Sequence, residues 1–262
     1  MKKRIAFLGA GKMAEGILSA MESADGVIMA EKIPARRKEL ERKYGVETTD
    51  SLAEAAKGAK IVFLCVRPQD ADAVAAEVAP FLKKSQTVVS IVAGKTLAKL
   101  RERIGAVPAL VRVMPNLALR AKAGMCAICA EKTTPESSVK AVGKILGAAG
   151  ETIVLDEKDF DAVTALSGSG PAYFAYMEEA MAEAGEALGL SRVAARLLSR
   201  QTMYGTAKFL KESGMETRPF IEGVCTKGGT TAAGMAFLAK GPFKRAVCAT
   251  LAAAAKRSKE LA

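Results

Sequence analysis

A short apolar run that leads directly into a glycine turn constrains the fold of this chain more than any other feature. Gly9, Gly11 and Ala14 follow the run with the spacing of a dinucleotide fingerprint, and a helical pattern begins at Lys12. In such a turn the first glycine permits the bend, and the second lets the backbone approach a pyrophosphate. The small third residue lets helix and strand pack closely. The segment therefore predicts a strand, a turn and a helix whose free N–H groups bind the pyrophosphate.

Apolar runs alternate with amphipathic stretches up to about residue 155. This alternation predicts a parallel sheet with helices on both faces, and the runs are continuously apolar because parallel strands are covered on both sides. The expected strands are Ile5–Leu8, Val27–Ala30, Ile61–Val66, Val88–Val92, Leu110–Met114, Gly124–Ala130 and Thr152–Leu155. The expected helices between them are Lys12–Ser23, Pro34–Lys43, Gln69–Leu82 and Leu97–Ile104, with one more that holds Pro135 in its first turn.

The pattern changes near Asp159, after which Ala, Leu, Met and Glu dominate and no strand is predicted. We therefore place a domain boundary there, with a dinucleotide-binding Rossmann-type domain at 1–158 and an all-helical domain at 159–262. Ser191 is an expected N-cap, and Gly189 and Gly214 are expected helix stops. The expected helices are Asp159–Leu188, Ser191–Glu212, Arg218–Val224, Thr230–Ala239 and Pro242–Glu260.

Composition excludes several chemistries. The 262 residues include no histidine, so Ser-His-Asp triads, Cys-His pairs and histidine metal sites are impossible, and we expect no metal. The formal net charge is +11, but the basic residues are scattered among acids, and the cluster at 36–38 has no interleaved aromatic residues. We therefore expect no nucleic-acid partner, and we interpret the charge as attraction for an anionic substrate and cofactor.

No apolar run reaches the ~18 residues of a membrane span, and the first run is too short for a signal peptide. We expect a cytoplasmic enzyme with no membrane partner. The odd count of five cysteines argues against a disulfide framework. Cys126 and Cys129 have the spacing of a redox or zinc pair, but they lie alone in an apolar stretch, which favours strand core.

Two further segments stand out by their glycine content. Gly223–Ala232 is rich in hydroxyl groups and glycine and leads into a helix, which indicates a second anion site. Ser167–Pro171 interrupts a long helical pattern with two glycines and a proline. The interruption predicts either a helix kink or a close approach of the backbone to a ligand or another helix, and the sequence does not decide between them.

With these landmarks in place, the chain resembles the pyrroline-5-carboxylate reductase family over nearly its whole length. The matching segments, in family order, are residues 9–14, 66–68, 90–94, 112–116, 167–173 and 228–231. Three positions depart from the family pattern. Arg67 replaces the usual lysine, Leu117-Ala118 replaces Thr-Pro, and Thr226-Lys227 replaces Ser-Pro. The last change alters a loop that should contact substrate.

The resemblance implies hydride transfer from a nicotinamide cofactor to the C=N carbon of a cyclic imine that bears a carboxylate. It further implies that Thr231 is catalytic and faces the imine nitrogen, and that the helical domain forms a homodimer, in some members within a larger ring such as a decamer. The substrate-binding residues implied by the resemblance are Thr226, Gly228, Gly229, Thr230, Thr231 and Met114. The cofactor-binding residues are Gly9, Gly11, Lys12, Met13, Ala14, Glu31, Val66, Arg67, Pro68, Ala93, Gly94 and Asn116.

The choice between NADPH and NADH stays open at this point. Glu31 lies 20 residues after Gly11 at the end of the second strand, where an acid typically binds the ribose 2′-hydroxyl and favours NAD. Lys32, Arg36 and Arg37 are close enough in sequence to receive a 2′-phosphate instead. Two alternative functions also stay open. One is a reductase of another imine or keto acid, and the other is a non-catalytic nucleotide-binding paralogue.

Overall fold

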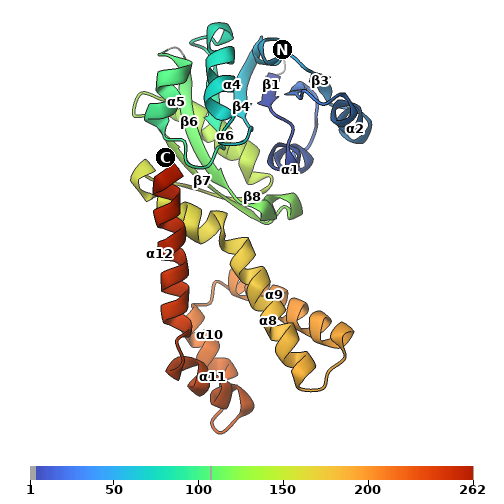
Figure 1. The fold of residues 1–262 in the computed structure, drawn as a ribbon, viewed down its shortest axis with the longest axis vertical. Helices are drawn as coiled ribbons and strands as arrows, with labels where there is room; N and C mark the ends of the chain where they lie inside the picture. Colours follow the sequence, from blue (N-terminus) through green and yellow to red (C-terminus); the bar gives the residue numbers. More distant parts are fainter. Residues whose placement is uncertain (1–3, 107, 262) are drawn as a thin grey trace. The chain divides into compact units, whose positions relative to one another are not determined.

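The computed structural model describes residues 4–106 and 108–261, and these residues form two compact units (Figure 1). Unit 1 takes the chain up to Ser169 together with the last residues from Ala254 onward. Unit 2 is Gly170–Ala253. The chain therefore passes between the units twice. The domain boundary that the sequence pattern predicts between residues 158 and 159 stays a prediction.

Unit 1 is built on an eight-stranded sheet with the order β3-β2-β1-β4-β5-β6-β7-β8. The neighbouring strands pair in parallel except β6 and β7, which are antiparallel. The chain reverses its direction of growth between β1 and β4, so these two neighbours flank the topological switch point. The strands are β1 Arg4–Leu8, β2 Val27–Ala30, β3 Glu47–Thr49, β4 Ala59–Leu64, β5 Thr87–Ser90, β6 Ala109–Pro115, β7 Gly124–Ala130 and β8 Gly150–Val154.

The sheet confirms the predicted α/β class and adds two features that the sequence pattern did not predict. The short polar edge strand β3 was missed, because Glu47–Thr49 carries no apolar signal. The antiparallel pairing of β6 and β7 follows from their short connection, the 3-10 turn η2 at Leu117–Ala121. Such a connection is too short for the crossover that a parallel neighbour requires.

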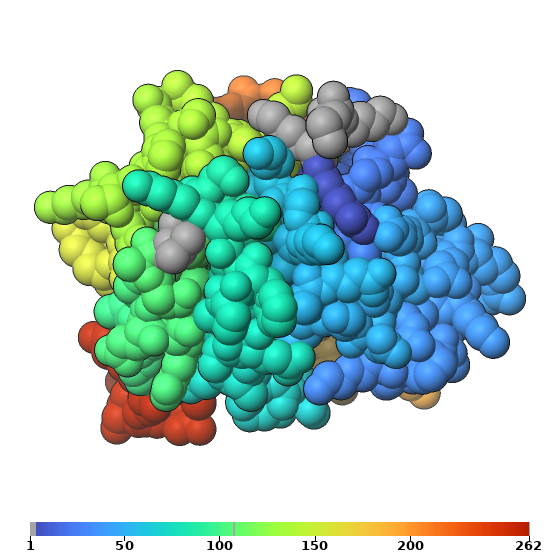
Figure 2. All heavy atoms as spheres, turned by 90° about the horizontal axis from the view of Figure 1, so that it is seen from above, coloured from blue at the N-terminus to red at the C-terminus, as the bar shows by residue number. Residues whose placement is uncertain are grey.

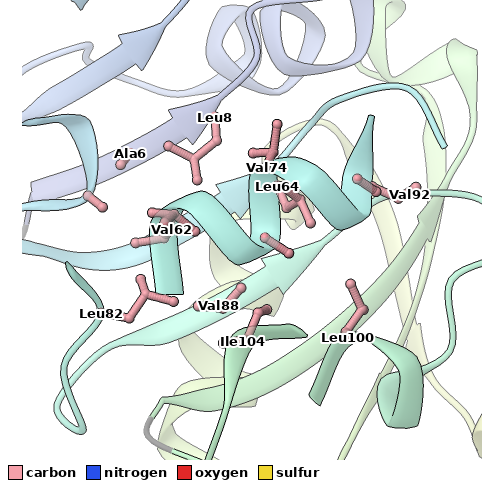
Figure 3. Packing of buried hydrophobic residues seen from close by; sticks show 14 of the residues in the cluster. Ala6, Leu8, Val62, Leu64, Val74, Leu82, Val88, Val92, Leu100 and Ile104 are labelled. Carbon is pink, nitrogen blue, oxygen red and sulfur yellow. The ribbon is translucent and has the colours of Figure 1, made fainter. Parts of the chain in front are cut away.

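Helices cover both faces of the sheet and bury two separate cores. They are α1 Lys12–Ala20, α2 Pro34–Tyr44, α3 Leu52–Ala56, α4 Ala71–Val78, α5 Leu97–Ile104 and α6 Glu136–Gly147. On one face, side chains of α3, α4 and α5 pack on β1, β4 and β5, as Figure 3 shows for Leu8, Val62 and Leu100. The other face packs against α1, α2 and α6. Figure 2 shows the first part of the chain, coloured blue to green, as a closely packed surface with all heavy atoms drawn.

The two cysteines of β7 belong to these cores. Cys126 lies in the cluster on the α1 face and Cys129 in the cluster on the α4 face, because residues three apart on a strand point to opposite sides. Burial raises the pKa of the Cys126 thiol to about 11 and, together with the nearby Glu157, that of Cys129 to about 12. The interpretation of this pair as strand core is confirmed.

The chain leaves the sheet through irregular helical segments. These are the 3-10 turn η3 at Glu157–Asp159, the helix α7 at Phe160–Val163 and the π-helical turn η4 at Thr164–Gly168, and the longer helix α8 Gly170–Ala187 follows them. The single expected helix Asp159–Leu188 is therefore broken where its glycines and proline predicted an interruption. Pro171 lies in the first turn of α8, where its missing N–H costs nothing.

Unit 2 is helical, as predicted. After α8 come α9 Arg192–Ser213, α10 Thr217–Val224, α11 Thr230–Lys240 and α12 Phe243–Leu261. The Ser191 side chain accepts a hydrogen bond from the Ala194 N–H and caps α9, and Gly214 ends that helix with φ +64°, so both predicted signals are confirmed. Within the described residues no helix is long and apolar enough to cross a membrane.

The end of α12 returns to unit 1. The Ser258 hydroxyl is buried and donates to the Asp161 carboxylate at 2.7 Å. Leu261 packs against Gly94, where an added Cβ would lie 2.9 Å from the Leu261 carbonyl oxygen. The final turns of the chain are thus part of the sheet unit.

Candidate active site

The glycine turn after β1 has the geometry that the sequence predicted. Gly9 has φ +96°, and an added Cβ would lie 2.8 Å from the Cys65 carbonyl oxygen, so both conformation and packing require glycine. Gly11 is the N-cap of α1, and an added Cβ there would have no neighbour within 4 Å. Ala14 is fully buried, which lets α1 lie close to the sheet. The turn therefore leaves open space directly above Gly11.

The first N–H groups of α1 face this open space without intrahelical partners, as at any helix start. No side chain caps the helix, so the N–H groups of Lys12 and Met13 stay available for a ligand. The helix dipole adds partial positive charge at the same place. This helix start therefore has the features of an anion-binding site.

The remaining predicted cofactor residues lie at the carboxyl ends of neighbouring strands, on the same edge of the sheet as the turn. Val66, Arg67 and Pro68 follow β4, and Ala93 and Gly94 follow β5. Ligands of open α/β sheets bind at this edge, beside the switch point between β1 and β4. The structure thus brings these predicted residues to one edge of unit 1.

The loop after β4 is held by its own contacts. An added Cβ on Gly9 would lie 3.0 Å from Cγ1 of Val66, so this valine packs directly under the glycine turn. Arg67 is 76% exposed and its Nε lies 2.9 Å from the Asp70 carboxylate. Both partners of this ion pair are exposed to solvent.

Asn116, just after β6, is held at both ends of its side chain. Its Oδ1 accepts from the Met125 N–H at 3.2 Å, and its Nδ2 donates to the Ser167 hydroxyl at 3.5 Å. Met114 on the same strand lies against Gly168, where an added Cβ would overlap the methionine methyl group. The backbone of the glycine-rich segment therefore closely approaches a strand side chain at Gly168, and an approach to a ligand stays a prediction.

The sequence analysis did not predict the ion pair between buried Arg112 and half-buried Glu157. Arg112 is 4% exposed, its Nη1 lies 2.9 Å from the Glu157 carboxylate, and its guanidinium stacks on the Phe160 ring at 4.8 Å. Glu157 also accepts from the N–H of Leu97, the first residue of α5. One sequence signal existed, namely a charged residue inside an otherwise apolar strand. The pair ties β6 to the segment that carries Gly168.

Glu31, after β2, reaches back over the glycine turn. One carboxylate oxygen accepts from the Ala10 N–H at 3.4 Å and the other from the Ile33 N–H at 3.0 Å. The acid therefore borders the cradle at the side where β2 ends. The sequence spacing predicted this proximity, but not the two backbone donors that fix the carboxylate.

The second glycine-rich loop belongs to unit 2. The Gly229 N–H donates to the Thr226 carbonyl at 2.9 Å and closes a turn in which Gly228 has φ +73°. Gly229 is the N-cap of α11 and receives no side-chain cap, so Thr230 and Thr231 are the first two helical residues. Neither threonine hydroxyl has a hydrogen-bond partner within the described chain, and both residues are exposed. This helix start is a second place with free backbone N–H groups.

The predicted site residues therefore fall into two sets. The cofactor set and Met114 lie in unit 1, and the other substrate residues, Thr226 to Thr231, lie in unit 2. Within the described residues, no group of three or more Asp, Glu, Cys or His side chains is placed to hold a metal ion.

Comparison with known proteins decides the family. Residues 157–261 match the model of the pyrroline-5-carboxylate reductase dimerisation domain, and residues 4–94 match that of the NADP oxidoreductase, coenzyme F420-dependent, family. A pyrroline-5-carboxylate reductase of Pseudomonas aeruginosa is 37% identical over 265 residues, which cover 99% of this chain and 97% of the relative. One from Synechocystis is 36% identical and covers 100% of this chain and 99% of the relative.

The chain belongs to the pyrroline-5-carboxylate reductase family.

Solved structures of this family agree with the assignment. A pyrroline-5-carboxylate reductase from Coxiella burnetii superposes with a TM-score of 0.95 at 30% identity and covers 100% of this chain and 99% of its own. The Plasmodium falciparum pyrroline carboxylate reductase, solved with NADP bound, gives a TM-score of 0.87 at 29% identity, with 99% and 98% covered. The resemblance predicted from the motifs is confirmed, and with it the oxidoreductase class. The matched dimerisation domain also supports self-assembly of the chain.

Proposed function

We propose that this chain reduces the cyclic imine 1-pyrroline-5-carboxylate to L-proline with NADH or NADPH. The main support is sequence identity of 36% and 37% to two pyrroline-5-carboxylate reductases over nearly the whole length of the chain. The chain also has two separate helix starts with free N–H groups, one suited to a dinucleotide and one to a small carboxylate. A reductase of an anionic imine needs both.

The cofactor fits the cradle of unit 1. Gly9 and Gly11 bring the backbone close to the pyrophosphate, the N–H groups of Lys12 and Met13 donate to it, and Ala14 keeps the helix near the sheet. Glu31 borders the ribose, and the loops after β4, β5 and β6 line the strand edge with the proposed contacts Val66, Arg67, Pro68, Ala93, Gly94 and Asn116. When bound, the nicotinamide supplies the hydride.

The substrate is held by the loop before α11. Its carboxylate accepts from the free backbone N–H groups of Thr230 and Thr231 at the start of α11, and the helix dipole favours the negative charge there. The turn through Thr226 and Gly228 gives the loop its shape, and a contact of the substrate with Met114 stays a prediction from the family resemblance. Lys227 is exposed and adds attraction for an anion.

Thr231 supplies the hydrogen bond to the imine nitrogen. Its hydroxyl is exposed at the first turn of α11 and is not used as a helix cap, because Gly229 occupies the N-cap position. A threonine hydroxyl is a weak acid, so it positions the nitrogen and relays a proton from water rather than donating its own outright. No histidine is available to take that role.

We also propose that two copies pair through the helices of unit 2, in a homodimer that can assemble into a larger ring such as a decamer. Large apolar side chains exposed on α8 and α9 support this proposal, among them Phe174 at 67% and Val193 at 80% exposure. Part of the active site then forms only where two copies meet. A cytoplasmic location, the absence of nucleic-acid and membrane partners, and the domain boundary at 158/159 remain part of the same proposal.

The decisive experiment follows the oxidation of NADH and NADPH separately, with and without 1-pyrroline-5-carboxylate. Thr231→Ala should lower turnover by ~10–1000-fold, the range seen when a positioned donor is lost, while cofactor affinity changes little. Thr231→Ser keeps the hydroxyl and should retain much of the activity. Thr230→Ala is the matched control at the neighbouring position and should be milder. Turnover by Thr231→Ala at the parent rate would refute the assigned role of Thr231.

One observation favours a second candidate function, the reduction of a different imine or keto acid. Lys227 stands where the family has proline, next to the residues that should hold the substrate. A panel of cyclic imines of different ring size and of 2-keto acids, assayed at equal concentration, separates the two. Lys227→Pro should sharpen the preference for the five-membered ring if the lysine broadens it.

A further inference from the structure

The carboxylate of Glu31 is fixed at the place where the adenosine ribose of a dinucleotide would lie. Two backbone N–H groups, of Ala10 in the glycine turn and of Ile33 beyond β2, each hold one of its oxygens. A carboxylate has about four acceptor positions, so two remain for ribose hydroxyls. The acid cannot swing away from the ribose without losing both of its donors.

Three of the basic residues that follow Glu31, namely Lys32, Arg36 and Arg37, are the candidates nearest in sequence for contact with a 2′-phosphate. Arg36 uses all three guanidinium nitrogens within the protein. Nε and Nη2 donate to the Ala10 carbonyl at 3.3 Å, Nη2 also bonds Glu15 at 2.6 Å, and Nη1 pairs with Glu39 at 2.8 Å. Glu15 is buried and holds Lys43 and Tyr44 as well. All three guanidinium nitrogens of Arg36 are therefore used, two in contacts that link α2 to α1 and the glycine turn and one in a contact within α2.

Arg37 is also engaged. Its Nη1 donates to the carbonyl oxygens of Glu31 and Lys32 at 2.7 and 3.2 Å, and its Nη2 lies 3.6 Å from the Asp50 carboxylate. These bonds hold the guanidinium against the backbone that follows β2. Lys32 is exposed and has no ion pair with any part of the chain that the structure describes. A lone flexible lysine next to a fixed carboxylate is a poor site for a phosphate, which prefers several donors.

We propose that the ribose subsite of this reductase selects the 2′-hydroxyl of NADH over the 2′-phosphate of NADPH. The proposal rests on the proposed nicotinamide-dependent function. Glu31 accepts from the ribose hydroxyls of NADH, whereas the 2′-phosphate of NADPH, with about −1.5 to −2 charge, would face the same carboxylate. The two arginines that could offset this repulsion are held in other contacts.

Binding measurements test the proposal without turnover. The dissociation constants of NADH and NADPH are measured by the fluorescence of the reduced nicotinamide, which has no tryptophan background because the chain contains none. NADH should bind at least ~10-fold tighter, the scale of one charged contact. Equal affinity, or tighter binding of NADPH, overturns the inference and leaves the proposed function standing. Failure of both to bind overturns the function itself.

Variants locate the origin of the preference. Glu31→Ser should shift the NADPH-to-NADH affinity ratio at least ~10-fold toward NADPH, and Glu31→Gln, which keeps the size and removes the charge, should shift it in the same direction. The matched control is Glu47→Ser, which removes the same charge from β3, where Glu47 is 59% exposed and pairs with Arg4. A ratio that stays constant in Glu31→Ser, or moves equally in Glu47→Ser, contradicts the assignment.

Lys32 provides the opposite test. If Lys32 does not form a phosphate site, Lys32→Ala should change the affinity ratio less than ~2-fold. A ~10-fold loss of NADPH affinity in this variant would show that Lys32 binds the 2′-phosphate and would overturn the proposal.

Discussion

The two units of this chain bury their apolar side chains in opposite ways. Unit 1 places large residues such as Phe7, Phe63 and Leu110 in two cores on the faces of its sheet, with essentially no exposure. In unit 2 only Gly170, Ala182, Ala195 and Ser199 are buried, while Leu188, Val193 and Phe237 are each at least 80% exposed. Unit 1 therefore obtains its core from its own chain, whereas the helices of unit 2 require another surface. Unit 1 thus buries its apolar side chains by itself, whereas we expect unit 2 to bury its own only when the chain assembles with another copy.

The largest effect should come from placing a charge on the exposed apolar face of α9. Leu197 is 68% exposed in the single chain, and Leu197→Asp would bury an unpaired carboxylate wherever that face is covered. We expect dissociation to monomers and loss of most activity, measured by size-exclusion chromatography with light scattering. The matched control is Phe81→Asp in unit 1, at a side chain that is 49% exposed, which should leave the mass unchanged. If Leu197→Asp keeps the oligomeric mass of the parent protein, the helices of unit 2 do not depend on assembly through this face.

A second prediction concerns the internal network of unit 1. Burial raises the pKa of Glu15, but hydrogen bonds from Lys43, Arg36 and Tyr44 outweigh it and lower the pKa from 4.5 to about 2. A carboxyl group with a lowered pKa in the folded state stabilises it above the unfolded value, and this contribution is lost as the pH falls from about 4.5 to about 2. The shift corresponds to roughly 3 kcal/mol.

Glu15→Gln should therefore lower the free energy of unfolding by roughly 3 kcal/mol at neutral pH and flatten its decline below pH 4.5. Denaturant unfolding across the pH range measures both. Glu77→Gln, on an exposed position of α4, is the control and should change stability by less than about 0.5 kcal/mol. An unchanged acid profile in Glu15→Gln would show that the network does not stabilise unit 1.

A smaller change, in cofactor affinity, is expected at the proposed pyrophosphate cradle, which lies entirely within unit 1. Gly11→Val should weaken NADH and NADPH alike by ~10–100-fold, about 1.4–2.8 kcal/mol, because the side chain enters space meant for the pyrophosphate. Gly147→Val at the end of α6 is a matched control, since an added Cβ is equally free of neighbours there. Equal cofactor affinity of the two variants would contradict the assignment of pyrophosphate binding to the turn at Gly11.

The sequence predicted most of unit 1 because its strands are continuous apolar runs and its helices are amphipathic. It missed β3 and α3, which are too short and, in the case of Glu47–Thr49, too polar to leave a pattern. The two glycine turns of the candidate site were predictable, because the backbone at Gly9 and Gly228 adopts a positive φ that favours glycine. The hydrogen bonds and ion pairs of Arg36 and Arg37 could not be predicted, because they join residues far apart in the chain.

The return of α12 to unit 1 has a consequence for synthesis on the ribosome. Domains generally fold as units from the N-terminus onward as the chain emerges. Here the loop after β5 meets its neighbour Leu261, and Asp161 its hydroxyl donor Ser258, only when the last turn of the chain has been made. Unit 1 is thus completed only by residues that lie beyond unit 2 in the sequence, so the loop after β5 reaches its final packing after all of unit 2 has been translated.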